Sequence, residues 1–176
     1  RDLFNILSSE IKESPYGNYI YKYIRYSQAI NIGDRTKNFG LRNPQEKIIT
    51  LNQYRGDYLL LSFWTAGNSQ TGSYLNCDGC LQMNQTLMDW YDKYHSKGLQ
   101  ILSVFLDRNK ADWVRGIQRD SLVWENVCDF QGFQGIVPIA YNVKSVPVIF
   151  LISSNGRIEA TDPLKIEKIL GNLYFN

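Results

Sequence analysis

Hydrophobic and polar positions change their period several times along the chain. Apolar residues recur at helical spacing in residues 3–11 and again in residues 19–24, and the breaker SPYG lies between them. Residues 30–39 then have the glycine and the mixed polarity of a linker. The pattern therefore predicts an N-terminal helical extension and linker over residues 1–31, followed by a second unit over residues 32–176.

The second unit begins with strand-like segments. NFGLR and KIITLNQ flank the turn-like NPQE, which predicts a β-hairpin. Further along, Asn155-Gly156 is a hairpin signal that leads into RIEAT as a last strand. Three runs are apolar on both faces, as is typical of interior strands covered by helices on both sides: residues 57–64, 99–106 and 146–153.

Helical segments alternate with these strands. Leu81 to Lys97 carries an apolar stripe and stops at Gly98, which predicts a long helix. Shorter helices are predicted at residues 111–119, at 135–143 with Pro138 near the first turn, and at 163–173. The resulting order β-β-β-α-β-α-α-β-β-α is typical of an α/β sandwich with a mixed sheet and a terminal hairpin.

Composition narrows the classes of function. Lys and Arg total 19 and Asp and Glu total 17, so the net charge of +2 gives no reason to expect a nucleic-acid partner. No apolar run is long enough for a membrane span. The single histidine, His95, argues against a histidine metal site or a Ser-His-Asp triad, and we predict neither a metal nor a cofactor. The chain starts with Arg1, so we expect a fragment or a mature form.

The main chemical signal is a Cys-x-x-Cys pair, Cys77 and Cys80, just before the helix predicted from Leu81. A cysteine at a helix N-terminus faces unpaired N–H groups and the positive end of the dipole, which lower the thiol pKa from about 8.5 to roughly 3.5–7.5. Such a thiolate can attack a disulfide, and the second cysteine can resolve the product. Residues 65–76 separate the pair from the strand end at Trp64, so a static disulfide in an inserted loop is the alternative.

Several blocks resemble the thioredoxin superfamily when taken in order: GDYLLLSFW, WYDKYHSKGLQILSVFLD, DWVRGIQRDSLVWENVCDFQGF and YNVKSVPVIFLISSNGRI. The resemblance runs from about Ile32 to Leu170, and it is nearest to the TlpA/ResA-like extracytoplasmic branch (redoxin or AhpC/TSA type). SPYGNYIYKYI is similar to the helical lead-in of larger members from Bacteroidetes-type bacteria. The resemblance implies a thioredoxin-like three-layer α/β sandwich, with a mixed central sheet, an N-terminal β-hairpin and an N-terminal helical extension.

The distance along the sequence at which the family places its cysteine pair can be measured on this chain from two residues. Measured back from Gly98, Cys80 falls on the second cysteine of the family. Measured forward from Trp64, the family pair would fall on Asn68 and Thr71. The chain therefore carries an insertion here. An insertion before the pair would form a flap and leave the dithiol intact, whereas an insertion that replaced the site would leave NSQT as an inert remnant.

The resemblance also implies roles for five residues. Cys77 would be the nucleophile and Cys80 the resolving cysteine. Val146 and Pro147 would bind substrate, because a cis-proline beside the dithiol leaves the preceding backbone free to pair with an extended chain. Trp64 would line the same site, with simple core packing as its alternative.

Three other features of the sequence bear on this chemistry or on the elements around it. Asp78-Gly79 between the cysteines departs from the family, in which proline commonly precedes the second cysteine, and the aspartate charge would oppose thiolate formation if close. Cys128 lies in a strand-like segment, which predicts a buried and inert thiol. Asp107 follows a central strand, and we expect it to cap the next helix.

Two functions follow from this sequence. The first is a thiol–disulfide oxidoreductase of the periplasm or cell envelope, which acts on protein or small-molecule disulfides and dithiols and needs a reducing partner. A lipid anchor on a missing N-terminus is one way in which the resemblance would place it there. The second is a redox-inactive binding module in which the inserted loop 65–76 has replaced the active site. A thiol peroxidase fits badly, because Tyr74 stands where its cysteine would follow Thr71.

Overall fold

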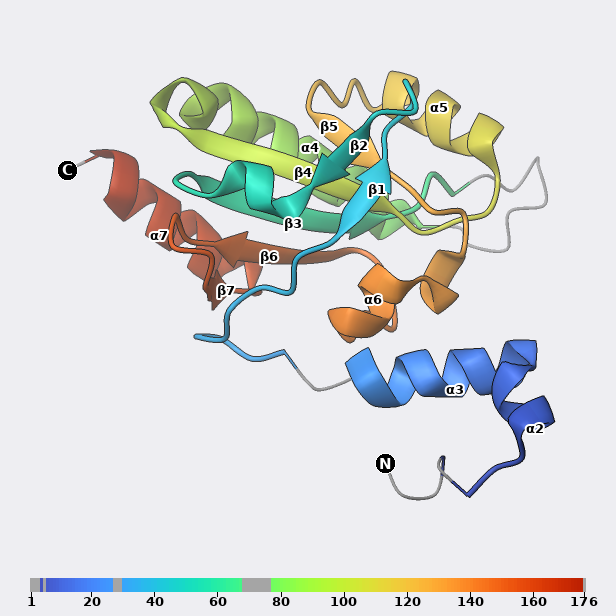
Figure 1. The fold of residues 1–176 in the computed structure, drawn as a ribbon. Helices are drawn as coiled ribbons and strands as arrows, with labels where there is room; N and C mark the ends of the chain where they lie inside the picture. The colour runs from blue at the N-terminus through green and yellow to red at the C-terminus, as the bar shows by residue number, and fades with distance from the viewer. Residues whose placement is uncertain (1–3, 5, 27–29, 68–76, 176) are drawn as a thin grey trace.

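The computed structural model describes residue 4 and residues 6–26, 30–67 and 77–175. A five-stranded sheet with the order β5-β4-β3-β6-β7 forms its centre (Figure 1). The strands are β3 (Tyr58–Trp64), β4 (Leu99–Phe105), β5 (Glu125–Val127), β6 (Val148–Ile152) and β7 (Ile158–Ala160). β3, β4 and β5 are parallel, whereas β6 is antiparallel to β3 and β7 is antiparallel to β6. The predicted mixed sheet is therefore confirmed.

Helices cover both faces of this sheet. The long elements are α4 (Asp78–Tyr94), α5 (Lys110–Arg119) and α7 (Pro163–Phe175), and the short ones are α6 (Ile136–Ala140) and the 3-10 turns η1 (Leu51–Tyr54), η2 (His95–Lys97) and η3 (Gly132–Gln134). Side chains of α4, α5 and α7 pack with Leu60 and Trp64 of β3 in one core cluster. Leu59, Leu61 and Phe63 point the other way, toward α6. The three-layer α/β sandwich expected from the sequence is confirmed.

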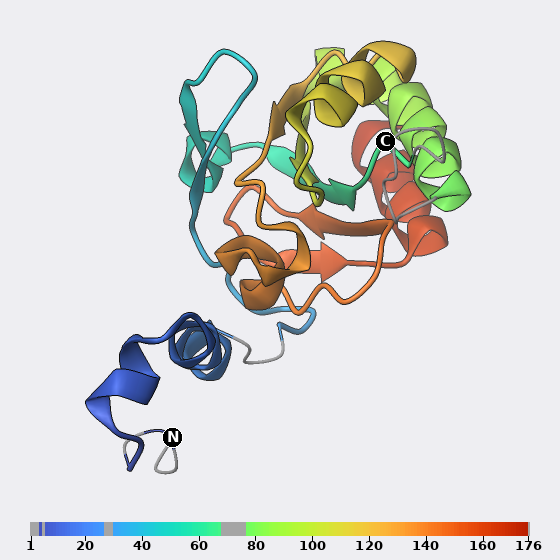
Figure 2. The ribbon, with the colours of Figure 1, turned by 90° about the vertical axis from the view of Figure 1, so that its right-hand side faces the viewer.

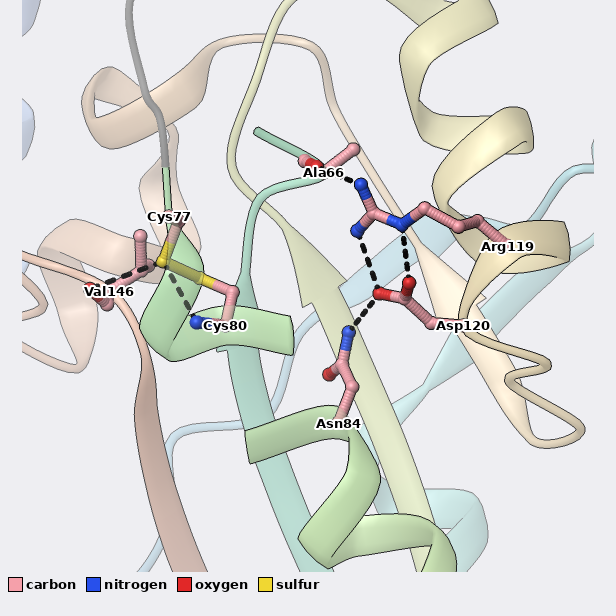
Figure 3. Close-up of a disulfide and its surroundings, with 7 residues drawn as sticks. All are labelled: Ala66, Cys77, Cys80, Asn84, Arg119, Asp120 and Val146. Atoms are coloured by element: carbon pink, nitrogen blue, oxygen red, sulfur yellow. Dashed lines mark hydrogen bonds and ion pairs between the residues drawn. A yellow bond between two sulfur atoms is a disulfide. The ribbon is translucent and has the colours of Figure 1, made fainter. Parts of the chain in front are cut away.

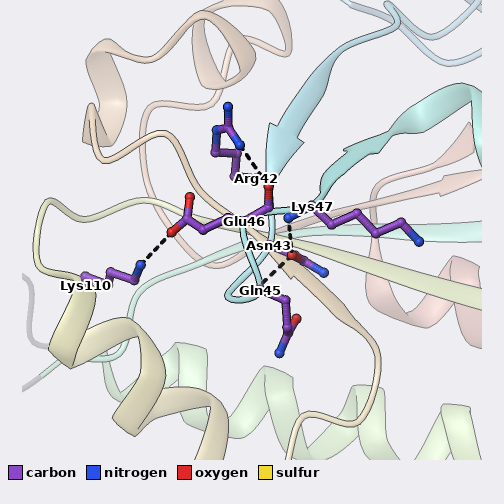
Figure 4. Close-up of polar contacts among 6 residues, drawn as sticks. All are labelled: Arg42, Asn43, Gln45, Glu46, Lys47 and Lys110. Atoms are coloured by element: carbon purple, nitrogen blue, oxygen red, sulfur yellow. Dashed lines mark hydrogen bonds and ion pairs between the residues drawn. The ribbon is translucent and has the colours of Figure 1, made fainter.

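The predicted hairpin forms from β1 (Gly40–Arg42) and β2 (Ile48–Thr50), which make a two-stranded sheet of their own. Its turn is organised by Asn43, whose side-chain oxygen accepts hydrogen bonds from the backbone N–H groups of Gln45 and Lys47 (Figure 4). The hairpin is joined to the main sheet because Cys128 N donates to Arg42 O at 3.0 Å. A leucine and an isoleucine of the hairpin, Leu41 and Ile49, are buried in the core cluster shared with α6.

The N-terminal segment is helical, as predicted, and lies outside the sandwich. It consists of α2 (Ser9–Glu13) and α3 (Pro15–Tyr26), which are set to one side of the sheet in both views (Figures 1 and 2). α3 contacts α6, and Tyr16 and Ile20 are exposed. A boundary between residues 31 and 32 stays a prediction. None of the described helices is long and apolar enough to cross a membrane.

The long helix confirms the expectation that Cys77 lies at a helix N-terminus. It starts at Asp78, before the apolar stripe that begins at Leu81, and Cys77 is its N-cap. It leaves α-helical geometry after Tyr94 and continues as η2 up to Gly98, whose φ of 106° suits glycine. The expectation that Asp107 caps α5 is wrong: Asn109 is the N-cap, and its side chain accepts from two backbone N–H groups of the first turn.

Candidate active site

Cys77 and Cys80 are joined by a disulfide at the start of α4 (Figure 3). Their Cα atoms are 5.2 Å apart, within the range that a disulfide can bridge. α4 itself creates this geometry, because Cys77 is its N-cap and Cys80 lies in its first turn. The start of the helix therefore holds the pair.

The first turn of α4 directs a backbone amide at the Cys77 sulfur. Cys80 N lies 3.1 Å from Cys77 Sγ and donates to it. Cys77 Sγ also stands at the positive end of the dipole of a long helix. Both features favour a negative charge on this sulfur after reduction. The carboxylate of Asp78 belongs to the same turn, but Asp78 is exposed, so solvent screens its charge.

The two sulfurs differ in their access to solvent. Cys77 is partly buried, whereas Cys80 is only 1% exposed and belongs to the core cluster of α4 and β3. A partner molecule approaching from outside therefore meets Cys77 first.

A cis peptide bond between Val146 and Pro147 precedes β6, beside the disulfide. Val146 O lies 3.7 Å from Cys77 Sγ. A disulfide sulfur carries no proton, so this is a packing contact in the oxidised protein, and a thiol at Cys77 could donate to the same oxygen. The Pro147 ring also faces Gly79, where an added Cβ would come within 3.3 Å of it. The folded chain thus brings residues 77–80 and 146–147 together.

Trp64 lies below the site rather than at its surface. Its side chain is 0% exposed and its ring makes an edge contact with Phe105, with centroids 5.2 Å apart. The other side of the ring is covered by α5 at Gly116, where an added Cβ would be 3.0 Å from the indole. This placement favours the packing role that the sequence left open for Trp64.

A polar network near the disulfide was missed by the sequence reasoning. Asn84, one turn after Cys80, donates from Nδ2 to Asp120 Oδ2 at 2.7 Å (Figure 3). Asp120 accepts from Nε and Nη2 of Arg119, and Arg119 Nη1 donates to Ala66 O at 2.8 Å. The Asp120 interaction raises the pKa of Arg119. The only signal in the sequence was an asparagine on the apolar face of a helix.

The third cysteine takes no part in the disulfide. Cys128 is buried and free, and burial raises the pKa of its thiol to about 12. The predicted burial of this thiol is confirmed, and its inertness stays a prediction. In the described ranges, no cluster of three or more His, Cys, Asp or Glu side chains could hold a metal ion.

The insertion is described only at its first residues. Thr65 and Ala66 are buried directly after β3, and Gly67 is partly buried. Residues 68–76, including NSQT, lie outside the described residues, so the predicted flap stays a prediction.

Comparison with known proteins agrees with this geometry. Thiol-disulfide oxidoreductase ResA of Geobacillus thermodenitrificans is 28% identical over 131 residues, covering 74% of this chain and 68% of the relative. A thiol-disulfide oxidoreductase structure from Bacteroides fragilis is 26% identical with a TM-score of 0.66, covering 77% and 99% of the two chains. The C-terminal domain of a Bacteroides thetaiotaomicron protein assigned as a thiol-disulfide oxidoreductase is 32% identical with a TM-score of 0.67, covering 81% and 97%.

The thioredoxin-like fold and its Cys-x-x-Cys pair at disulfide distance define a thiol–disulfide oxidoreductase. The AhpC/TSA family model matches residues 32–161. The match covers most of the sequence, and the chain belongs to the AhpC/TSA family.

Proposed function

We propose that Cys77 and Cys80 are the catalytic dithiol, with Cys77 as the nucleophile and Cys80 as the resolving cysteine. The observation that carries this proposal is the amide of Cys80 directed at Cys77 Sγ, at the N-terminus of α4. The difference in exposure supports the same order of attack, because Cys80 is buried behind Cys77.

The reaction balances with these two sulfurs alone. The Cys77 thiolate attacks one sulfur of a substrate disulfide, and the other substrate sulfur leaves as a thiolate that takes a proton. Cys80 then loses its proton and attacks Cys77 Sγ, which breaks the mixed disulfide and releases the second substrate thiol. The substrate gains two electrons, the protein keeps the Cys77–Cys80 disulfide, and a dithiol partner must reduce it for the next cycle.

Substrate contact is proposed for Val146 and Pro147. Val146 O lies beside the attacking sulfur, so an extended substrate that pairs with this backbone would bring its disulfide to Cys77. For Trp64 we propose a supporting role, because its buried indole fills the space between β3 and α5 beneath the dithiol.

The substrates that we propose are protein or small-molecule disulfides in the periplasm or cell envelope. The resemblance to the extracytoplasmic ResA-like branch supports this location. We also propose that residues 1–31 form an extension outside the catalytic unit of residues 32–176, since α2 and α3 lie apart from the sheet.

Insulin reduction with dithiothreitol as the electron donor tests the dithiol assignment. We expect Cys77→Ser and Cys80→Ser to lose at least about 100-fold in rate, because neither variant can complete the exchange cycle. Cys128→Ser is the matched control and keeps the wild-type rate, since Cys128 is buried and is not bonded to either cysteine of the pair.

Alkylation followed by mass spectrometry supplies the second measurement. Mild reductant should open the Cys77–Cys80 bond and expose Cys77 to alkylation before Cys80. A bond that resists strong reductant, together with equal insulin reduction in wild type and Cys77→Ser, would instead support a redox-inactive binding module.

A further inference from the structure

The side-chain amide of Asn84 has a hydrogen-bond partner for its nitrogen but none for its oxygen among the described residues. Asn84 is 1% exposed, and Cys80, which is also 1% exposed, belongs to the apolar core cluster of α4 and β3. Its Nδ2 donates to Asp120, whereas its Oδ1 has no hydrogen-bond partner among the described residues. A buried amide oxygen without a partner costs free energy, so it marks a place where a donor is expected in another state of the protein.

Asp120 determines which atom of the Asn84 amide lacks a hydrogen-bond partner. An ionised carboxylate only accepts hydrogen bonds, so the NH₂ group of Asn84 must face it and Oδ1 must face away. The orientation is held firmly, because the Asp120 side chain is itself 1% exposed and is bound by two nitrogens of Arg119. The arrangement is visible in Figure 3.

The helix places Asn84 on the face that also carries the resolving cysteine. Asn84 follows Cys80 by one turn, so the two side chains share a face of α4. Helical side chains tilt toward the N-terminus, and Asn84 therefore extends over the turn that carries Cys80. In the disulfide, the Cys80 sulfur has no proton and cannot donate. Reduction adds two electrons and two protons to the pair, which gives Cys80 a buried S–H group.

We propose that Asn84 Oδ1 accepts a hydrogen bond from the Cys80 thiol in the reduced protein. This inference rests on the proposed function, in which Cys80 is the resolving cysteine. The bond exists only after reduction, so it stabilises the dithiol relative to the disulfide and makes the protein a stronger oxidant. It also keeps Cys80 protonated while Cys77 carries the thiolate.

The test is the redox equilibrium with glutathione. We expect Asn84→Leu to favour the disulfide by about fivefold, which corresponds to a reduction potential lower by about 20 mV. Asn126→Leu is the matched control, because Asn126 is 2% exposed on β5 and its Oδ1 likewise has no partner among the described residues. The control should leave the equilibrium constant unchanged. Equal constants for Asn84→Leu and wild type would overturn the proposal.

A second measurement uses reduced wild-type protein and Cys80→Ser, and it does not depend on Asn84→Leu. The S–H stretching band of reduced wild-type protein, assigned by its loss in Cys80→Ser, should lie at the lower frequency of a hydrogen-bonded thiol. A band at the frequency of a free thiol would overturn the inference even if Asn84→Leu fails to fold. Wild type that neither equilibrates with glutathione nor reduces insulin would instead overturn the proposed function.

Discussion

Individual cysteines in this chain differ mainly through what surrounds each sulfur. Cys77 has a backbone amide directed at its sulfur and lies at a helix N-terminus. Cys128 Sγ accepts a hydrogen bond from the backbone N–H of Phe130, which lowers the pKa of the thiol. Burial has the larger effect and raises that pKa. The same atom type is therefore prepared for ionisation at one position and held protonated at the other.

The Cys128 thiol should make the protein less stable at high pH. Its pKa is raised from 9.0 to about 12 in the folded protein, so the folded state holds its proton longer than the unfolded state does. The stability is full below pH 9 and falls by up to about 1.4 kcal/mol per pH unit between pH 9 and 12.

Urea unfolding across this pH range measures the effect of the Cys128 thiol. Burial raises the pKa of Tyr54 and Tyr141 as well, so wild type alone does not isolate it. The difference in the free energy of unfolding between wild type and Cys128→Ala isolates the effect of the thiol. A constant difference from pH 8 to 12 would contradict the prediction.

At the scale of elements, the contact between β3 and α5 depends on a missing side chain. Gly116 of α5 lies against the residues that follow β3, and an added Cβ would be 2.7 Å from Ala66 Cβ and 3.0 Å from the Trp64 ring. Real Cβ atoms do not approach this closely, so α5 can lie here only because residue 116 is glycine.

Gly116→Ala should therefore destabilise the protein by about 1–3 kcal/mol, because the added methyl group overpacks this contact. Gly171→Ala is the matched control, since Gly171 lies in α7 and a Cβ there would have no neighbour within 4 Å. It should stabilise by up to about 1 kcal/mol through helix propensity. Thermal unfolding of both variants measures whether each substitution lowers or raises the stability of the protein. Equal effects of the two substitutions would refute the packing argument.

Helix starts show how far local sequence could predict the elements. The apolar stripe located the body of α4, and the motif placed its N-terminus at Cys77, which is the N-cap in the structure. Asp107 and Asn109 are both residue types that cap helices well, and in the structure Asn109 is the N-cap. Periodicity predicts the body of a helix better than its ends.

At the scale of the whole molecule, two ion pairs connect elements that are far apart in the sequence. Glu46 of the hairpin turn contacts Lys110 of α5 at 2.6 Å, and both side chains are more than half exposed (Figure 4). Asp120 with Arg119 connects α5 to α4 and to the end of β3, and its carboxylate is buried. We therefore expect the two pairs to contribute differently to stability because of their burial, not because of the distance between their charged atoms.

Removing each carboxylate should show this difference. We expect Asp120→Ala to lower the free energy of unfolding by about 3 kcal/mol, because it removes the carboxylate that pairs with Arg119 and leaves the buried Asn84 amide without its acceptor. Glu46→Ala should cost at most about 1 kcal/mol, since solvent screens that pair. Chemical denaturation gives both values, and similar losses would show that burial does not govern these pairs.

The sequence by itself determined the layer order, the hairpin and the dithiol. These features follow from periodicity, turn residues and a short motif, all of which act over a few neighbouring positions. Tertiary structure alone decided that Trp64 is covered, and that Asn84 contacts Asp120. The physical reason is that exposure and long-range hydrogen bonds depend on how separate elements pack, which no local pattern encodes.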